Sequence, residues 1–102
     1  EMEESSKKLK CTLKDYIVNI DKTIFNLSFE NTGSKDSIEI TKATLYTNQN
    51  DVIDITNVIA VQPEEIKELK LEFNTDYTFP TKLILERKNG DKKPIMYSFE
   101  IK

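Results

Sequence analysis

The feature that most constrains the fold is a two-residue hydrophobic repeat that recurs along the chain. In its clearest instance, Phe25, Leu27 and Phe29 alternate with polar residues at positions 26, 28 and 30. Successive side chains of a β-strand point to opposite faces of a sheet, so this pattern predicts a strand with one buried face.

The same alternation recurs in other segments of the chain. These segments are Leu9–Leu13, Tyr16–Ile20, Ile38–Ile40, Ala43–Leu45, Leu69–Phe73, Leu83–Leu85 and Ile95–Ile101. The phase of the repeat slips at Asp15, which predicts a β-bulge or a strand that switches sheets, and again near Thr41–Lys42, which predicts a second bulge. Residues 1–8 are polar and aperiodic, and we expect them to form a flexible lead-in or linker.

Clusters of turn-forming residues separate the expected strands. Gly33 lies in one such cluster and can adopt a positive φ. Asn89-Gly90 is the strongest hairpin signal and predicts a type I′ turn. Residues 64–71 are the one candidate for a short helical turn, although the two-residue repeat from Leu69 to Phe73 favours a strand.

The pattern as a whole predicts a single all-β domain over residues 9–102. Strands that follow one another at intervals of roughly 8–12 residues, with turns between them, are typical of a sandwich. We therefore expect an immunoglobulin-like antiparallel β-sandwich of about seven strands, although the Cys pair and the Trp of antibody domains are absent.

The residue counts exclude much chemistry. The chain has no His, which excludes a Ser-His-Asp triad, a Cys-His pair and a His-ligated metal. Its one Cys cannot form an internal disulfide or a Cys-only zinc site, and Cys11 follows the apolar phase of its strand. The net charge is −3 and most basic residues are scattered, so we expect no nucleic-acid binding. We assign no catalytic residue and no cofactor, and we expect no enzymatic activity.

The segment from Phe25 to Ile40 resembles a hairpin of many extracytoplasmic immunoglobulin-like domains. Its string Phe-Glu-Asn-Thr-Gly-Ser, followed by Ile38 and Ile40, is similar to hairpins in bacterial surface domains and in archaeal pilin-like and archaellum accessory (stator) proteins. The residues that carry the match are Asn31, Thr32, Gly33 and Pro63. Those families often have a Pro-Gly-Glu turn before the fifth strand, and here Glu64 occupies the place of the glycine. The resemblance implies a location outside the cytoplasm or at the cell surface, with any membrane contact made through a segment upstream of Glu1.

Two polar clusters are candidates for sites. Oxygen ligands for calcium could come from Asn48, Asn50, Asp51 and Asp54. Calcium takes about six to eight oxygens, the stretch lacks the Gly and terminal Glu of an EF-hand loop, and turn formation by Asx side chains accounts for it equally well. A second cluster consists of Glu64, Glu65, Glu68 and Glu72, whose interleaved lysines favour a solvated, charge-paired face over paired catalytic carboxylates.

The segment Val52–Val61 is long, β-branched and nearly free of charge. At the edge of a sheet it would be a template for strand addition, whereas as a central strand it would belong to the core. Our candidate interaction residues are Val52, Ile53, Ile55, Val58, Ile95 and Tyr97.

Two functions remain open from the sequence. The first is a non-enzymatic structural or protein–protein interaction module in a surface or filament-associated assembly, whose protein partners include a second copy of itself. The alternative is a calcium- or carbohydrate-binding accessory domain of a larger secreted protein, and the absence of Trp lowers the carbohydrate option.

Overall fold

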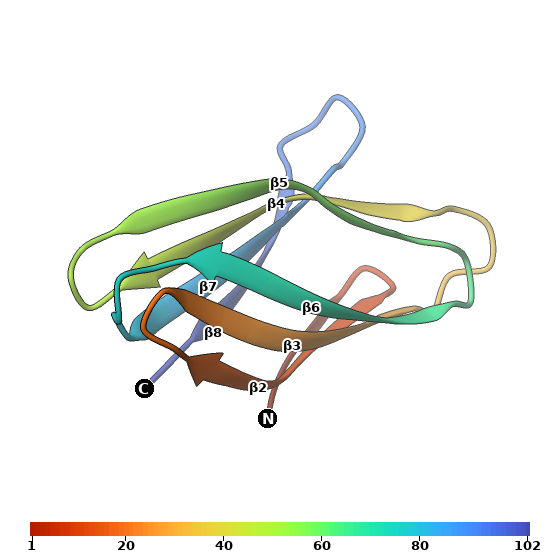
Figure 1. The fold of residues 1–102 in the computed structure, drawn as a ribbon. Coiled ribbons are helices and arrows are strands. Elements are labelled where there is room, and N and C mark those ends of the chain that lie inside the picture. The colour runs from red at the N-terminus through yellow and green to blue at the C-terminus, as the bar shows by residue number, and fades with distance from the viewer.

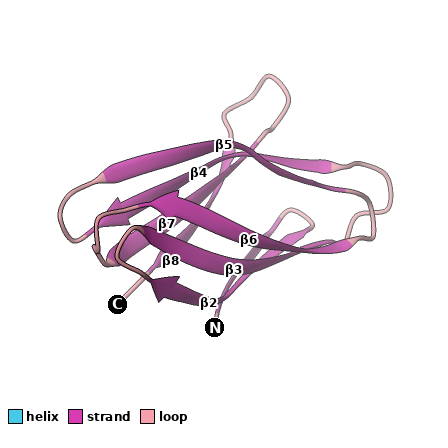
Figure 2. Cartoon of the chain, viewed as in Figure 1, coloured by secondary structure: helices cyan, strands magenta, loops and turns pink.

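The computed structural model describes residues 1–102 as two antiparallel sheets packed face to face (Figures 1 and 2). The strands are β1 (Met2–Ser6), β2 (Leu9–Val18), β3 (Lys22–Asn31), β4 (Ile38–Thr47), β5 (Val52–Val61), β6 (Ile66–Asn74), β7 (Pro80–Arg87) and β8 (Ile95–Glu100). The first sheet has the order β1-β2-β3-β6, and the second has the order β5-β4-β7-β8. The predicted all-β sandwich is confirmed, with eight strands where the sequence indicated about seven. No helix in the structure is long and apolar enough to cross a membrane.

The two-residue repeat fills the space between the sheets, as expected. Phe25, Leu27 and Phe29 of β3 are all buried, with 0–1% of their surface exposed. Phe25 also packs edge-on against Phe73 of β6, with ring centroids 5.8 Å apart. Such T-shaped pairs add stability beyond the area they bury. The core therefore lies on the inner faces of both sheets and continues along the length of β3.

Both phase slips correspond to irregularities in strand pairing. The register between β2 and β3 shifts between Leu13 and Asp15. The register of β4 shifts between Ile40 and Lys42 against both of its neighbours, β5 and β7. β2 has one extra residue against β3, and β4 has one extra residue against β7. The bulge predicted near Thr41–Lys42 is therefore confirmed, and of the two alternatives at Asp15 the bulge is the one present.

The expectation of a flexible lead-in is wrong for Met2–Ser6. These residues form β1, which pairs antiparallel with β2 from Met2 opposite Leu13 to Ser6 opposite Leu9. All five side chains of β1 are exposed, so the strand lacks the alternation that reveals a half-buried strand. The turn to β2 places Lys7 and Lys8 at φ values of 46° and 70°, a backbone that favours Asn-Gly.

Two predicted turns also differ from expectation. In the β7–β8 loop only Gly90 has a positive φ, of 57°, and the Lys92 N–H donates to the Asn89 carbonyl at 3.0 Å. A type I′ turn needs a positive φ at both central residues, so this loop is longer and of another type. Gly33 keeps a negative φ. The lack of a side chain matters at this position because the space is tight: a Cβ there would lie 3.1 Å from Asn31 Oδ1.

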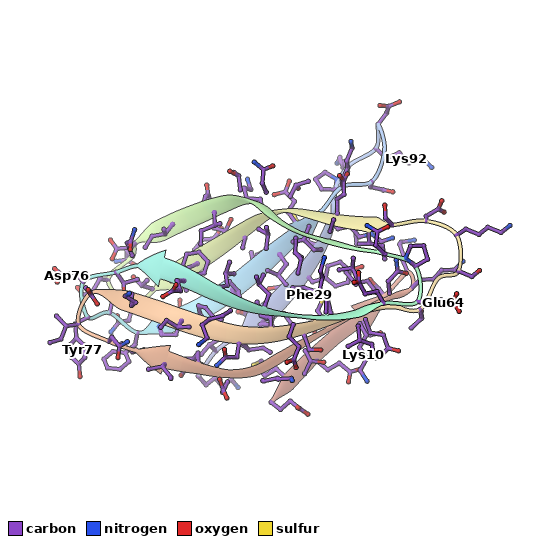
Figure 3. All side chains as sticks on the ribbon, turned by 45° about the vertical axis from the view of Figure 1, so that its right-hand side comes forward. Lys10, Phe29, Glu64, Asp76, Tyr77 and Lys92 are labelled. Carbon is purple, nitrogen blue, oxygen red and sulfur yellow. The ribbon has the colours of Figure 1, made fainter.

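The β5–β6 turn contains a residue in a strained backbone conformation. Glu64 has a φ of 63° and its N–H donates to the Gly33 carbonyl at 3.0 Å, so this turn rests on the β3–β4 loop. No helical turn forms over residues 64–71, where the strand favoured by the two-residue repeat is present instead. Glu64 is exposed at the tip of this end of the sandwich (Figure 3).

We expect Glu64→Gly to raise the free energy of unfolding by about 0.5–1 kcal/mol. Glycine removes the cost of a left-handed residue, roughly 1–2 kcal/mol, and part of that gain is offset by the greater backbone entropy of glycine in the unfolded chain. Urea denaturation followed by circular dichroism measures the change. The matched control is Lys70→Gly in the middle of β6, which should lower stability, and a loss of stability in both variants would contradict the prediction.

Candidate interaction surface

The segment Val52–Val61 is strand β5, and it lies at the edge of its sheet. It pairs with β4 alone, from Tyr46 opposite Val52 to Ile38 opposite Val61. The backbone of one side of β5 therefore has no strand beside it in the same sheet. Of the two roles that the sequence left open for this segment, the structure shows the edge strand.

The six candidate interaction residues differ in their exposure. Val52 is 59% exposed on the outer face of the sheet. Four others are partly buried and pack against the core, and these are Ile53, Ile55, Val58 and Ile95. Tyr97 is 2% exposed and is a core residue, so its assignment to a contact surface is corrected. The alternation of β8 placed Tyr97 on the apolar face, and that face points inward.

The two halves of β5 are not equally accessible. Asn57 has a φ of 54°, and two residues of β5 lie between the pairs Lys42–Thr56 and Ile40–Ile59. A bulge of this kind bends the strand that carries the extra residue. The Lys67 ammonium of β6 also donates to the Ala60 carbonyl at 2.8 Å, which covers the edge there. The open edge is therefore the first half, Val52–Thr56, hereafter the β5 edge.

The hydrogen-bond pattern tells which backbone groups of the β5 edge point away from β4. The Thr47 N–H donates to the Asp51 carbonyl at 3.1 Å, which makes these two residues a hydrogen-bonded pair. Such pairs alternate with non-bonded pairs along an antiparallel ladder. The N–H and C=O groups of Val52, Asp54 and Thr56 accordingly point outward, toward the position of an additional strand.

Exposed apolar side chains gather at the end of the sandwich where β5 begins. Ile20 is 77% exposed, Tyr77 is 59% exposed and Phe79 is 48% exposed. The rings of Tyr77 and Phe79 pack against each other with centroids 5.6 Å apart. Hydrogen bonds join their loops, from the Tyr77 N–H to the Ile20 carbonyl and from the Asn48 N–H to the Phe79 carbonyl. Figure 3 shows Tyr77 at the tip of this end, next to Asp76.

Three of the four candidate calcium ligands form the β4–β5 turn, and the fourth, Asp54, lies in β5. The Asn48 side-chain oxygen accepts from the Phe79 N–H at 3.0 Å, and Asn50 adopts a φ of 63°. Asp51 accepts from the Thr47 hydroxyl at 3.3 Å, and Asp54 accepts from the Thr44 hydroxyl at 2.6 Å. No group of three or more acidic, Cys or His side chains is placed to hold a metal ion. Turn formation accounts for Asn48, Asn50 and Asp51, whereas Asp54 lies within β5 and binds Thr44 across the strand pair.

The two members of the acidic cluster that lie on β6, Glu68 and Glu72, form ion pairs on the outer face of their sheet. Glu72 lies 3.6 Å from Lys22, and Glu68 accepts a hydrogen bond from Lys14. That bond is the main cause of a raised pKa at Lys14, whose side chain is exposed. Glu65 instead accepts from the Gln62 N–H at 2.8 Å in the β5–β6 turn. The charge-paired face predicted from the sequence is therefore present for Glu68 and Glu72, whereas Glu64 and Glu65 belong to the turn before β6.

The thiol of Cys11 is a core group. It is 0% exposed, and its burial raises the pKa from 9.0 to about 12, against the opposing effect of the positive charge of Arg87. A nucleophilic cysteine needs a low pKa and access to solvent. Cys11 has neither, so it packs as a small hydrophobic side chain, as the sequence indicates.

Comparisons with known proteins give a likeness of shape only. No protein-family model and no curated protein matches the sequence. Among solved structures, the chain is similar to a β-glucosidase from Kluyveromyces marxianus in complex with glucose, with a TM-score of 0.48 and 13% identity. A selenomethionine-labelled crystal structure of the same enzyme gives the same values. In both cases the match covers 92% of this chain and 14% of the enzyme, so the chain spans a small fraction of its length.

Proposed function

We propose that this domain is a non-enzymatic protein–protein interaction module that binds a second copy of itself through the β5 edge. The observation that carries this proposal is the run of outward-pointing backbone groups from Val52 to Thr56, which no other element covers. An added strand would satisfy these groups with main-chain hydrogen bonds. The exposed side chain of Val52 lies beside them on the outer face.

The other three edge strands are less suited to pairing. Sheet edges in natural proteins are usually guarded by charged side chains or kept short. β6 alternates charged residues from Lys67 to Glu72, and β1 is a five-residue strand with two glutamates. β8 is six residues long and lies against β1. Asp54 is the one charged residue of the β5 edge, and the Thr44 hydroxyl already binds its carboxylate.

Two copies can pair antiparallel about a two-fold axis without opposing like charges. If Ile53 lies on the axis, Val52 faces Asp54 of the second copy, and if Ile55 lies on it, Asp54 faces Thr56. Neither arrangement places Asp54 opposite its own equivalent, which would be destabilising. Pairing of this kind joins two four-stranded sheets into one of eight strands.

We further propose that the domain works outside the cytoplasm or at the cell surface. The support is the resemblance of the segment Phe25–Ile40 to hairpins of bacterial surface domains and of archaeal pilin-like and archaellum accessory proteins. Fractionation of the source cells, with an antibody against this domain, tests the location. Recovery of the protein in the cytoplasmic fraction alone would contradict it.

We expect the double variant Val52→Lys, Thr56→Lys to weaken self-association by about ten-fold or more, a loss of ~1.4 kcal/mol. Lysines on an edge oppose strand addition, and both residues are exposed, so the fold should be retained. Sedimentation equilibrium at concentrations up to about 1 mM is the measurement, because a small interface binds weakly.

The matched control is Met96→Lys on β8, at the opposite edge of the same sheet. Met96 is 54% exposed, so this variant adds the same charge at a similar position on the other side. It should leave self-association unchanged. A wild-type chain that stays monomeric over the whole concentration range, or equal weakening by Met96→Lys, would refute pairing through the β5 edge.

A further inference from the structure

We propose that the end of the sandwich nearest Glu64 binds an oxyanion of the phosphate or sulfate class. A polar cavity of about 190 Å³ lies between the β1–β2 turn, the β3–β4 loop and the end of β7. Three cationic residues line it, Lys8, Lys35 and Arg87, and Asp36 is the single acidic residue among the lining. The excess of positive charge favours an anion with more than one negative oxygen.

Arg87 supplies a fixed positive charge to this cavity. Its Nη1 donates to the Lys7 carbonyl at 2.8 Å and to the Tyr97 hydroxyl at 3.0 Å. The Tyr97 hydroxyl in turn donates to the Ser6 carbonyl at 3.1 Å. None of the ion pairs in the structure involves Arg87. Its guanidinium is therefore held in place by neutral acceptors, and its charge is available to a ligand.

The β3–β4 loop adds backbone donors beside the cationic side chains. The N–H groups of Ser34, Lys35 and Asp36 make no hydrogen bond within the protein. The loop is nevertheless held in shape, because the buried Asn31 side chain donates to the Asp36 carbonyl at 2.9 Å and accepts from the Gly33 N–H at 2.9 Å. Successive backbone N–H groups in a turn can line an anion-binding concavity, and these three residues border the cavity.

The β1–β2 turn places Lys8 at the cavity in spite of its backbone strain. Lys7 and Lys8 both have a positive φ, where Asn and Gly would be favoured. The Lys8 carbonyl accepts from both the N–H and the hydroxyl of Thr32, which ties the turn to the β3–β4 loop. This tie holds Lys8 beside the β3–β4 loop, at the cavity.

The test is isothermal titration calorimetry of the whole chain with sodium phosphate, with sodium sulfate and with sodium citrate in separate arms, at constant ionic strength. We expect saturable binding of phosphate and sulfate with one site per chain. Lys8→Gln and Lys35→Gln should each weaken the affinity by about five-fold, the scale of an exposed charge pair, and the double variant should weaken it by about 25-fold. Both lysines are exposed, so these variants should fold. Citrate binding more tightly than phosphate and sulfate would overturn the assigned class.

The matched control is Lys22→Gln, which removes the same charge at the opposite end of β3 from Asn31. Phosphate affinity should stay within two-fold of the wild-type value, about the error expected for a remote surface charge. Phosphate should also shift the amide resonances of Ser34, Lys35 and Asp36 in NMR spectra. The proposal would be overturned if the heat of binding does not saturate with added phosphate. It would also be overturned if Lys22→Gln weakens the phosphate affinity as much as the cavity variants do, or if the three amide resonances do not shift.

Discussion

Replacing Phe29 with alanine is expected to lower the free energy of unfolding by about 3–5 kcal/mol, the usual cost of emptying a buried aromatic position. Phe29 is 0% exposed and points between the two sheets (Figure 3). A small domain has a total stability of about 5–15 kcal/mol, so this loss would leave the variant close to unfolding at 25 °C. The chain has no Trp, so urea denaturation is best followed by circular dichroism or tyrosine fluorescence.

Two controls separate the effect of the core from the effect of substitution itself. Phe29→Leu keeps most of the buried volume and should cost only about 1–2 kcal/mol. Ile66→Ala removes an apolar side chain that is 65% exposed at the start of β6, and it should change stability by less than about 0.5 kcal/mol. Similar losses in Phe29→Ala and Ile66→Ala would contradict the position of the core.

The free energy of unfolding is also expected to fall at alkaline pH. Burial raises the pKa of Cys11 from 9.0 to about 12, so between these values the thiol ionises in the unfolded chain and stays protonated in the folded one. The folded state then binds more protons, and stability falls as the pH rises. The contribution of Cys11 is intact below pH 9.0 and declines by about 1.4 kcal/mol per pH unit above it, a loss of about 2–3 kcal/mol by pH 11.

The measurement is the free energy of unfolding of the wild type and of Cys11→Ala between pH 7 and pH 11. All other ionisable groups are common to both proteins, so the difference between the two curves isolates the thiol. The alanine variant should lack the alkaline decline due to Cys11. Parallel curves over the whole range would mean that Cys11 is not the buried group that the structure describes.

Local patterns in the sequence predicted the sandwich well because every second residue of a half-buried strand faces the core and is apolar. The repeat at Phe25, Leu27 and Phe29 identified β3, and the phase slips identified both bulges. Alternation failed where no face is buried, which is why β1 was missed. The Asn89-Gly90 pair also misled, because a dipeptide does not report the length of the loop around it.

The candidate sites were harder to predict because they depend on strand order. The residues of Val52–Val61 are compatible with both an edge strand and a central strand. Only the strands beside it in space decide which of the two it is. The direction of the apolar face of β8 likewise decides that Tyr97 is buried. Lys8, Lys35 and Arg87 come from three separate segments, and no motif links them. The positive φ values of Lys7 and Lys8 could not be predicted either, because lysine rarely adopts this backbone conformation.

The presence of a single unguarded edge limits the size of any assembly built by strand addition. An open filament needs two different complementary surfaces on every subunit, whereas an isologous contact uses the same surface on both partners and closes on itself. A molecule that offers only the β5 edge would therefore stop at a pair. Growth into a longer polymer would have to use some other surface, such as the apolar loops around Tyr77.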